Sequence, residues 1–196
     1  MRSDQKSKYR APTINRDGLS GDAMSAAGTD TRGDSSITIR GQNFGPDGSA
    51  GVVVEYGPAG NPAQYTAKNC AVKDGGHDTI ACDTVPGIGK DLFWTVRIGG
   101  QYSVRSDQKS KYRAPTRPSL DGPAFTSQSP TEGQMSIRIV GDFFGPAGNE
   151  GISVYYGPLG NTKKYEALDC RVLPGENQVH KVVSCKTSIG VGKELF

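Results

Sequence analysis

The sequence predicts an all-β protein made of two tandem β-sandwich units. Three observations carry this prediction: a long internal repeat, short apolar–polar alternations bounded by Gly and Pro, and few large apolar residues. Of 196 residues, 27 are Gly and 12 are Pro, and hydrophobic residues make up only 34%. This composition suits thin sandwiches, in which each strand buries one face and turns are frequent. We therefore expect two small cores rather than one thick core.

A repeat of about 100 residues organises the chain. Residues 2–13 and 105–116 both read RSDQKSKYRAPT, and GQNFGP at 41–46 is matched by GDFFGP at 141–146. This period is too long for a solenoid unit and has the size of a whole sandwich domain. The positions of the repeated motifs predict the tail of a preceding module at 1–13, a complete module at 14–116 and a C-terminally truncated module at 117–196.

The second module stops at Phe196, which matches Phe93 of the first, so it has no counterpart of residues 94–104 in this chain. Two explanations are open. The chain represents part of a longer array, or the tail of one chain completes the open module of another by strand donation. The tail matches only the stretch after the missing segment, so donation alone does not fill the gap. The complete identity of residues 2–13 with 105–116 has no evident physical reason.

Period-two alternation predicts the strands, and Ile37 and Ile39 on one face are typical of the pattern. Gly99-Gly100 predicts a hairpin turn. No helical apolar pattern persists for three turns, so we expect almost no helix. The expected strands are 36–40, 52–56, 79–82, 93–98 and 101–104 in the first module, and 136–140, 152–156 and 182–185 in the second.

Four cysteines fall two per module, and their repeated spacing predicts two disulfides, Cys70 with Cys82 and Cys170 with Cys185. Each would close a loop of about a dozen residues, worth about 3 kcal/mol in the chain-entropy model. Disulfides of this kind place the protein outside the cytosol.

Zinc binding is the alternative interpretation of the cysteines, because His77 and His180 repeat at the same spacing. Two Cys and one His per module leave a tetrahedral site one ligand short, and no close Cys-x-x-Cys pair is present. We therefore expect no metal and no cofactor.

The order of these motifs resembles the IPT/TIG domain, the immunoglobulin-like fold shared by plexins and transcription factors. GQNFGP at 41–46 and VPGIGK at 85–90 are the most specific pieces, and the paired cysteines are similar to fibrocystin-type cell-surface arrays. The second module departs from the pattern at Ile189, where the first has Pro. The resemblance implies tandem immunoglobulin-like sandwiches. We expect Phe44 in the core, with Gly41 and Gly45 supplying positive φ where the backbone bends.

The sequence lacks the motifs of catalytic sites, such as nucleophile elbows, zincin helices and phosphate-binding loops, so we expect no enzyme. The net charge of +3, with both signs mixed, does not favour nucleic acid. No apolar run is long enough to span a membrane, so we expect no membrane insertion within this segment.

Two short segments invite a binding interpretation. Arg32-Gly33-Asp34 is the tripeptide familiar from integrin ligands, but three residues match by chance often. Residues 109–113, KSKYR, are basic with an aromatic, as in a polyanion contact. We favour a final strand here, with the charges outward and Tyr112 inward.

The predicted function is an extracellular structural or adhesive protein, part of a cell-surface or filamentous assembly. Its partners would be neighbouring modules or copies of itself. The alternative is a glycan- or protein-binding accessory module of a receptor or carbohydrate-active enzyme, with Tyr155 and Tyr156 as candidate contacts. A Rel-type transcription factor module is a third possibility, which the paired cysteines and the modest charge disfavour.

Overall fold

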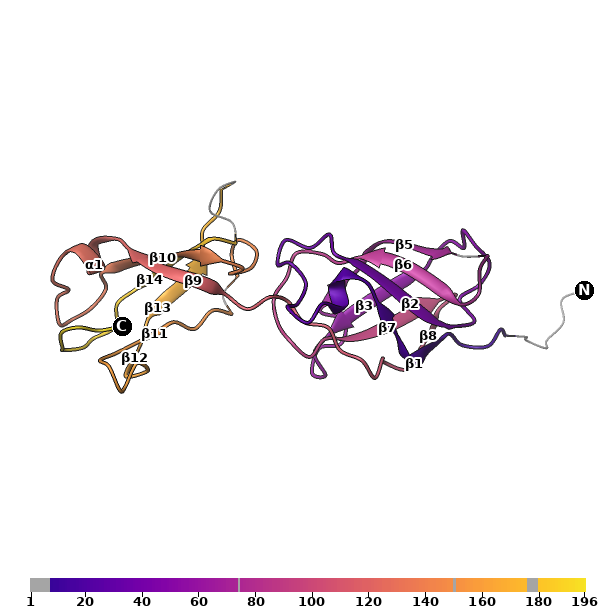
Figure 1. The fold of residues 1–196 in the computed structure, drawn as a ribbon, viewed down its shortest axis with the longest axis horizontal. Coiled ribbons are helices and arrows are strands. Elements are labelled where there is room, and N and C mark those ends of the chain that lie inside the picture. The colour runs from indigo at the N-terminus through magenta and orange to yellow at the C-terminus, as the bar shows by residue number, and fades with distance from the viewer. Residues whose placement is uncertain (1–7, 74, 150, 176–179) are drawn as a thin grey trace, which may run out of the picture. The chain divides into compact units, whose positions relative to one another are not determined.

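The chain is all-β, with several antiparallel sheets and very little helix. The computed structural model describes residues 8–73, 75–149, 151–175 and 180–196. The chain divides into two compact units, Met1–Tyr112 (unit 1) and Arg113–Phe196 (unit 2) (Figure 1). The module boundary expected between residues 116 and 117 therefore lies slightly beyond this division. Among the described residues, no helix has the length and apolar character needed to cross a membrane.

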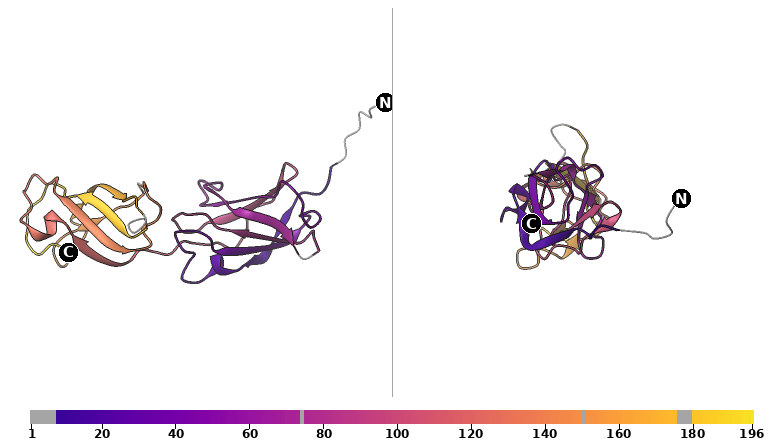
Figure 2. Two further views of the ribbon diagram at one scale, coloured as in Figure 1. Left: turned by 90° about the horizontal axis from the view of Figure 1, so that it is seen from above. Right: turned by 90° about the vertical axis from the view of Figure 1, so that its right-hand side faces the viewer.

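Unit 1 contains two four-stranded antiparallel sheets and the short 3-10 helix η1 (Asp22–Met24). Figure 2 shows the ribbon from two further directions. The first sheet has the order β1 (Thr13–Ser20), β2 (Ser36–Gln42), β6 (Thr79–Asp83), β5 (Lys68–Lys73). The second has the order β4 (Tyr65–Thr66), β3 (Val53–Gly57), β7 (Phe93–Ile98), β8 (Gln101–Tyr102).

The core of unit 1 receives alternate side chains from both of its sheets. Ile37 and Ile39 of β2 are fully buried, as are Tyr56 of β3 and Trp94 and Val96 of β7. All of them belong to one apolar cluster. Period-two alternation therefore puts the apolar set of each strand on the same inner face.

Unit 2 repeats this strand order only in part, together with the short helix α1 (Pro123–Thr126). Its larger sheet has the order β13 (Leu168–Val172), β14 (Val182–Lys186), β10 (Ser136–Asp142), β9 (Thr116–Asp121). Its smaller sheet has two strands, β11 (Tyr155–Tyr156) and β12 (Tyr165–Glu166). Among the described residues of unit 2, no strand takes the place of β7 or β8.

The absence of that neighbour explains why β11 is shorter than expected. β3 pairs with β4 on one side and with β7 over Val53–Gly57 on the other. β11 pairs with β12 alone, at Tyr155 and Tyr156. The expected strand at 152–156 is therefore reduced to two residues in this structure.

The two glycines around Phe44 serve different purposes, which corrects part of the sequence-based expectation. Gly45 does adopt a positive φ, of 85°. Gly41 does not; a Cβ there would collide with the Thr13 carbonyl oxygen and the Phe44 ring. Gly41 is thus required by the close approach of β1 and of Phe44, whose side chain is fully buried. A core role for Phe44 agrees with the prediction.

Candidate functional site

Each unit carries one disulfide between neighbouring strands of the same sheet. Cys70 of β5 is bonded to Cys82 of β6, and Cys170 of β13 is bonded to Cys185 of β14. These are the pairs that the spacing predicts. Cys82 and Cys185 are almost completely buried, so the bridges form part of the two apolar clusters.

The repeated histidines lie at a turn. His77 and His180 both have positive φ, and their carbonyl oxygens accept hydrogen bonds from the backbone N–H groups of Phe44 and Phe144, each at 2.9 Å. In the part of the chain that the structure describes, no group of three or more His, Cys, Asp or Glu side chains is arranged to hold a metal ion.

The Arg-Gly-Asp tripeptide is engaged within unit 1. The Arg32 guanidinium donates two hydrogen bonds to the Asp30 carboxylate, at 3.0 and 2.8 Å. Asp34 forms an ion pair with Lys68. Both charged groups that an integrin would need are thus paired with other residues of the chain.

Residues 105–112, here called the closing segment, complete unit 1. The Trp94 indole N–H donates to the Ser110 hydroxyl at 2.9 Å, and the Trp94 backbone N–H donates to the Ser106 hydroxyl at 2.9 Å. The β-pairing of the segment consists of isolated bridges, an antiparallel one between Leu92 and Ser110 and a parallel one between Thr29 and Tyr112. The inward tyrosine agrees with the prediction, but the segment is not a regular strand.

At the end of this segment, the Tyr112 side chain fills a hole that we call the tyrosine slot. The Tyr112 hydroxyl lies 2.7 Å from the Tyr56 hydroxyl and donates to the Val85 carbonyl at 2.6 Å. Its ring meets the Tyr65 ring edge-on, with 5.6 Å between centroids. A Cβ at Gly87 would lie 2.8 Å from both tyrosine rings, so the slot requires glycine there. Burial, the largest cause, raises the pKa of Tyr112 and of Tyr56 above the usual value.

The described part of unit 2 repeats two walls of this slot, and we call this place the open slot. Tyr165 and Gly190 correspond to Tyr65 and Gly87, and a Cβ at Gly190 would again lie 2.8 Å from the tyrosine ring. The Tyr156–Tyr165 centroid distance of 5.4 Å is close to the 5.1 Å of Tyr56–Tyr65. A pocket of about 440 Å³ is present here, lined by Thr131, Glu132, Tyr165, Ile189, Gly190 and Val191.

The hydroxyl of Tyr156, the counterpart of Tyr56, has its hydrogen bonds satisfied by Ser188. The Ser188 backbone N–H donates to the Tyr156 hydroxyl at 3.0 Å, and the two hydroxyl oxygens lie 3.0 Å apart. In unit 1 the corresponding residue is Val85, which has no hydroxyl, and Tyr112 supplies that group instead. Tyr156 therefore does not need a third tyrosine to satisfy its polar atom.

The rim of the open slot is apolar and exposed. Of the residues that line it, Ile189 is 77% exposed and Val191 is 65% exposed. Leu195 is half-buried, whereas its counterpart Leu92 is only 1% exposed under the closing segment.

The two candidate tyrosines of β11 do not form a common platform. Successive side chains of a strand point to opposite faces. Tyr155 is 44% exposed and has the Lys163 ammonium 5.8 Å from its ring centroid. Tyr156 is half-buried, with its hydroxyl bonded to Ser188. Only Tyr155 offers a ring to solvent.

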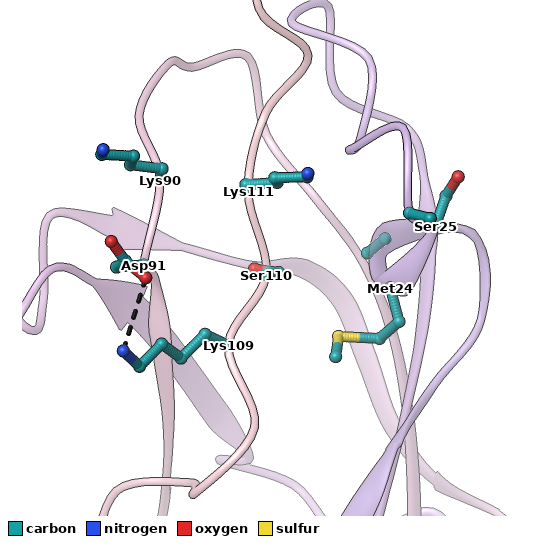
Figure 3. A pocket seen from close by; sticks show the side chains of 9 residues that line it. Met24, Ser25, Lys90, Asp91, Lys109, Ser110 and Lys111 are labelled. Carbon is teal, nitrogen blue, oxygen red and sulfur yellow. Dashed lines mark hydrogen bonds and ion pairs between the residues drawn. The ribbon is translucent and has the colours of Figure 1, made fainter.

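A second hollow, in unit 1, is basic. Lys90, Lys109 and Lys111 contribute to a pocket of about 420 Å³, and Lys109 lies 3.4 Å from Asp91. Figure 3 shows these lysines on two neighbouring segments, with Met24 and Ser25 on a third. The Lys90 and Lys111 side chains point in opposite directions, so the lysines do not converge on one point (Figure 3).

A comparison with protein-family models gives no match, and a comparison with curated proteins gives none either.

Sequence reasoning missed the slot residues Tyr165, Gly190 and Val191, although a signal for them was present. Tyr112 recurs as Tyr9 in the repeated segment, whereas the part of unit 2 present in this chain has no equivalent tyrosine.

Proposed function

We propose that this chain is a segment of a non-enzymatic, extracellular structural or adhesive protein built from tandem immunoglobulin-like β-sandwiches of the IPT/TIG type. The observation that carries the proposal is the repeated disulfide: two units in succession bear a bridge between corresponding strands. The two packed sheets of unit 1 and the motifs GQNFGP and GDFFGP support the sandwich assignment.

The bridges favour an oxidising compartment, because glutathione and thioredoxin keep such thiols reduced in the cytosol. A cell-surface or extracellular location follows. Bridged, glycine-rich sandwiches in tandem serve well as spacers, since each unit retains its shape with a small core. In this function the partners are neighbouring modules or further copies of the chain.

Contacts along such an array require exposed apolar surface, and unit 2 supplies it. Ile189, Val191 and Phe196 are each more than half exposed. Apolar surface that is rimmed by polar groups is typical of protein–protein contact sites.

The proposal is tested on material isolated from its natural source. Peptide mapping by mass spectrometry without reduction should recover Cys70 joined to Cys82 and Cys170 joined to Cys185. An impermeant amine-reactive label applied to intact cells should modify the protein's surface lysines. Free thiols in the native protein, or protection from the label until the cells are lysed, would refute the extracellular assignment.

Tyr155 supports a glycan-binding accessory role, because its ring is exposed beside Lys163. A screen against immobilised glycans decides this alternative. A bound glycan whose signal disappears in Tyr155→Ala would favour it over the structural role, and a screen without binders would remove it.

A further inference from the structure

We propose that the outer face of unit 1 along the closing segment binds a sulfated polysaccharide. This surface, here called the basic strip, consists of Lys90, Arg97, Arg105, Lys109 and Lys111. The inference rests on the proposed function for its extracellular setting and deepens it, because it names a class of ligand. Three observations lead to it: the distribution of charge along the chain, the way the fold turns the cations outward, and the aromatic rings that position them.

The positive charge of the chain is concentrated in one short sequence. Residues 105–113 read RSDQKSKYR, and the same nine letters stand at 2–10. These two copies hold eight of the 23 Lys and Arg residues and two of the 20 Asp and Glu residues, which leaves 15 basic and 18 acidic residues for the rest. Outside the two copies the net charge is therefore −3. A basic segment in an otherwise acidic chain is the electrostatic mark of a surface for an anionic partner.

The fold turns the cations of the closing segment outward by burying the serines between them. The hydroxyls of Ser106 and Ser110 accept hydrogen bonds from the backbone and indole N–H groups of Trp94, each at 2.9 Å. Arg105 and Lys109, next to these serines in the sequence, are exposed. The cations are therefore carried by a backbone that is already fixed, so a ligand binds with little loss of chain entropy.

Aromatic rings on the same side of the sheet position three of the cations. The Arg105 guanidinium carbon lies 4.4 Å from the Phe93 ring centroid, and the Lys109 ammonium nitrogen lies 5.1 Å from it. Arg97 points to the same face of β7 as Phe93 and lies 5.7 Å from the Tyr102 ring centroid. No ion pair in the described part of the chain involves Arg97 or Arg105. A guanidinium stacked on a ring keeps its N–H groups at its edge, where they can bind an oxyanion in bidentate fashion.

The strip suits a linear polymer better than a single small anion. Lys90 and Lys111 line one pocket but point in opposite directions (Figure 3). Between Arg105 and Lys111 an extended backbone spans up to about 20 Å. A polymer with anionic groups on successive units can contact such separated cations in turn, whereas a small anion reaches one or two of them.

The rings also distinguish between the classes of polyanion. Proteins that bind single-stranded nucleic acid present free aromatic faces on which the bases stack. Phe93 is half-buried with Arg105 and Lys109 over its ring, so it offers no such platform. A sulfated polysaccharide requires only cationic hydrogen-bond donors, and guanidinium and ammonium groups supply them. The two disulfides favour the compartment in which such polymers occur.

Three carboxylates on or beside the strip limit its affinity. Asp91 lies 3.4 Å from Lys109, and Asp107 belongs to the closing segment. Glu55 of β3 is paired with Thr95 of β7, and its side chain points to the outer face. Because five cations face three carboxylates, we expect a dissociation constant of about 10–100 µM in about 50 mM salt.

The decisive experiment is isothermal titration calorimetry of the whole 196-residue chain with a heparin dodecasaccharide. Arg105→Ala and Lys109→Ala should each weaken binding by about fivefold, the effect of one charge contact at the surface. Each should also lower the slope of log affinity against log salt by about one. Arg105→Lys, which keeps the charge, should retain the wild-type slope.

Lys163→Ala is the matched control. Lys163 is an exposed lysine beside an aromatic ring, 5.8 Å from the Tyr155 centroid, but it belongs to unit 2. Its removal changes the net charge of the chain as Lys109→Ala does and should leave heparin binding unchanged. An equal loss in this variant would show attraction to the chain's overall charge and would overturn the strip. Fluorescence of Trp94, followed in urea, verifies that unit 1 is folded in the variants of the strip.

Other polyanions test the class of ligand. Hyaluronan of the same length, which has carboxylates but no sulfates, and a single-stranded DNA 12-mer should each bind at least about tenfold more weakly than heparin. DNA that binds as tightly as heparin would identify a nucleic-acid surface instead, and equal binding to phosphatidylserine vesicles would identify a membrane surface. A heparin affinity weaker than about 1 mM in about 50 mM salt would overturn the inference altogether.

The two proposals fail separately. The titration uses purified protein, so an absence of heparin binding leaves the cysteine mapping of native material untouched. Free thiols in native material would refute the extracellular setting, while the heparin affinity and its loss in Arg105→Ala would still be measured as stated.

Discussion

Units 1 and 2 contain corresponding sheets and corresponding disulfides, and they differ in the closing segment. In unit 1, β7 and residues 105–112 bury Trp94, Tyr56 and Tyr112 completely or almost completely. In unit 2 the corresponding Tyr156 is only half-buried, and its cluster contains fewer fully buried side chains. The comparison teaches that the disulfide-linked sheets of the two units are alike, and that in unit 1 the aromatic part of the core packs with the closing segment.

The largest expected effect comes from removing the aromatic centre of unit 1. Trp94→Ala should destabilise unit 1 by about 3–5 kcal/mol, because a large buried ring is lost together with its stacking on Tyr56, 4.2 Å away between centroids. Calorimetry should show one transition moving to lower temperature. The transition of unit 2, which has no corresponding residue in this chain, should stay in place; a similar shift of both would contradict the independence of the units.

Removing the bridges should have the next largest effect, and it should act on both units. Opening either disulfide should lower the free energy of unfolding by about 3 kcal/mol, since loops of 12 and 15 residues are released. The unfolding of Cys70→Ala/Cys82→Ala is measured by urea denaturation. Trp94 is the only tryptophan, so its fluorescence reports unit 1 alone. The matched variant Cys170→Ala/Cys185→Ala should leave the fluorescence transition unchanged.

A smaller effect is expected from the phenol groups of the slot. Tyr112→Phe should destabilise unit 1 by about 1–3 kcal/mol, because the buried Val85 carbonyl and Tyr56 hydroxyl lose a partner. Tyr165→Phe in unit 2 should have little effect, since the hydroxyl there bonds to Val191 at an exposed position. Chemical denaturation measures the loss in free energy of unfolding for each variant. Equal losses would show that the Tyr165 hydroxyl is as well shielded from water as the Tyr112 hydroxyl.

The smallest expected difference between the units is the change of their stability at alkaline pH. The raised pKa values of Tyr56 and Tyr112 mean that the folded state favours the neutral phenol. Their contribution to stability is complete below the unfolded value of about 10 and falls as pH rises above it. A hydrogen bond from the Val191 backbone, with Lys164 adding to it, lowers the pKa of Tyr165, so its contribution has the opposite sign and is lost as pH falls through the folded pKa. Ultraviolet titration should show Tyr165 ionising first and the buried pair last.

Sequence patterns located the strands whose alternation is unbroken, such as β2, β6 and β7. They missed β1, β5 and β13, whose pairing registers shift within the strand. In β1 the shift falls between Ile14 and Leu19, and such irregularities interrupt the period of two on which the prediction depends. The cysteine pairs were predictable because their spacing repeats. The slot was not, because its walls come from three segments that only the fold brings together.

The positions of the disulfides determine how such a protein would respond to pulling. Each bridge spans a β-strand, a loop and the next strand, so the residues between its cysteines cannot be drawn out even when a unit unravels. At about 3.5 Å for each extended residue, about 40 Å of chain in unit 1 and about 50 Å in unit 2 are withheld from extension. The closing segment lies outside the bridge of unit 1 and would be pulled away first. When an array of these units is pulled, each unit would therefore extend by a limited length, because its disulfide loop cannot be drawn out.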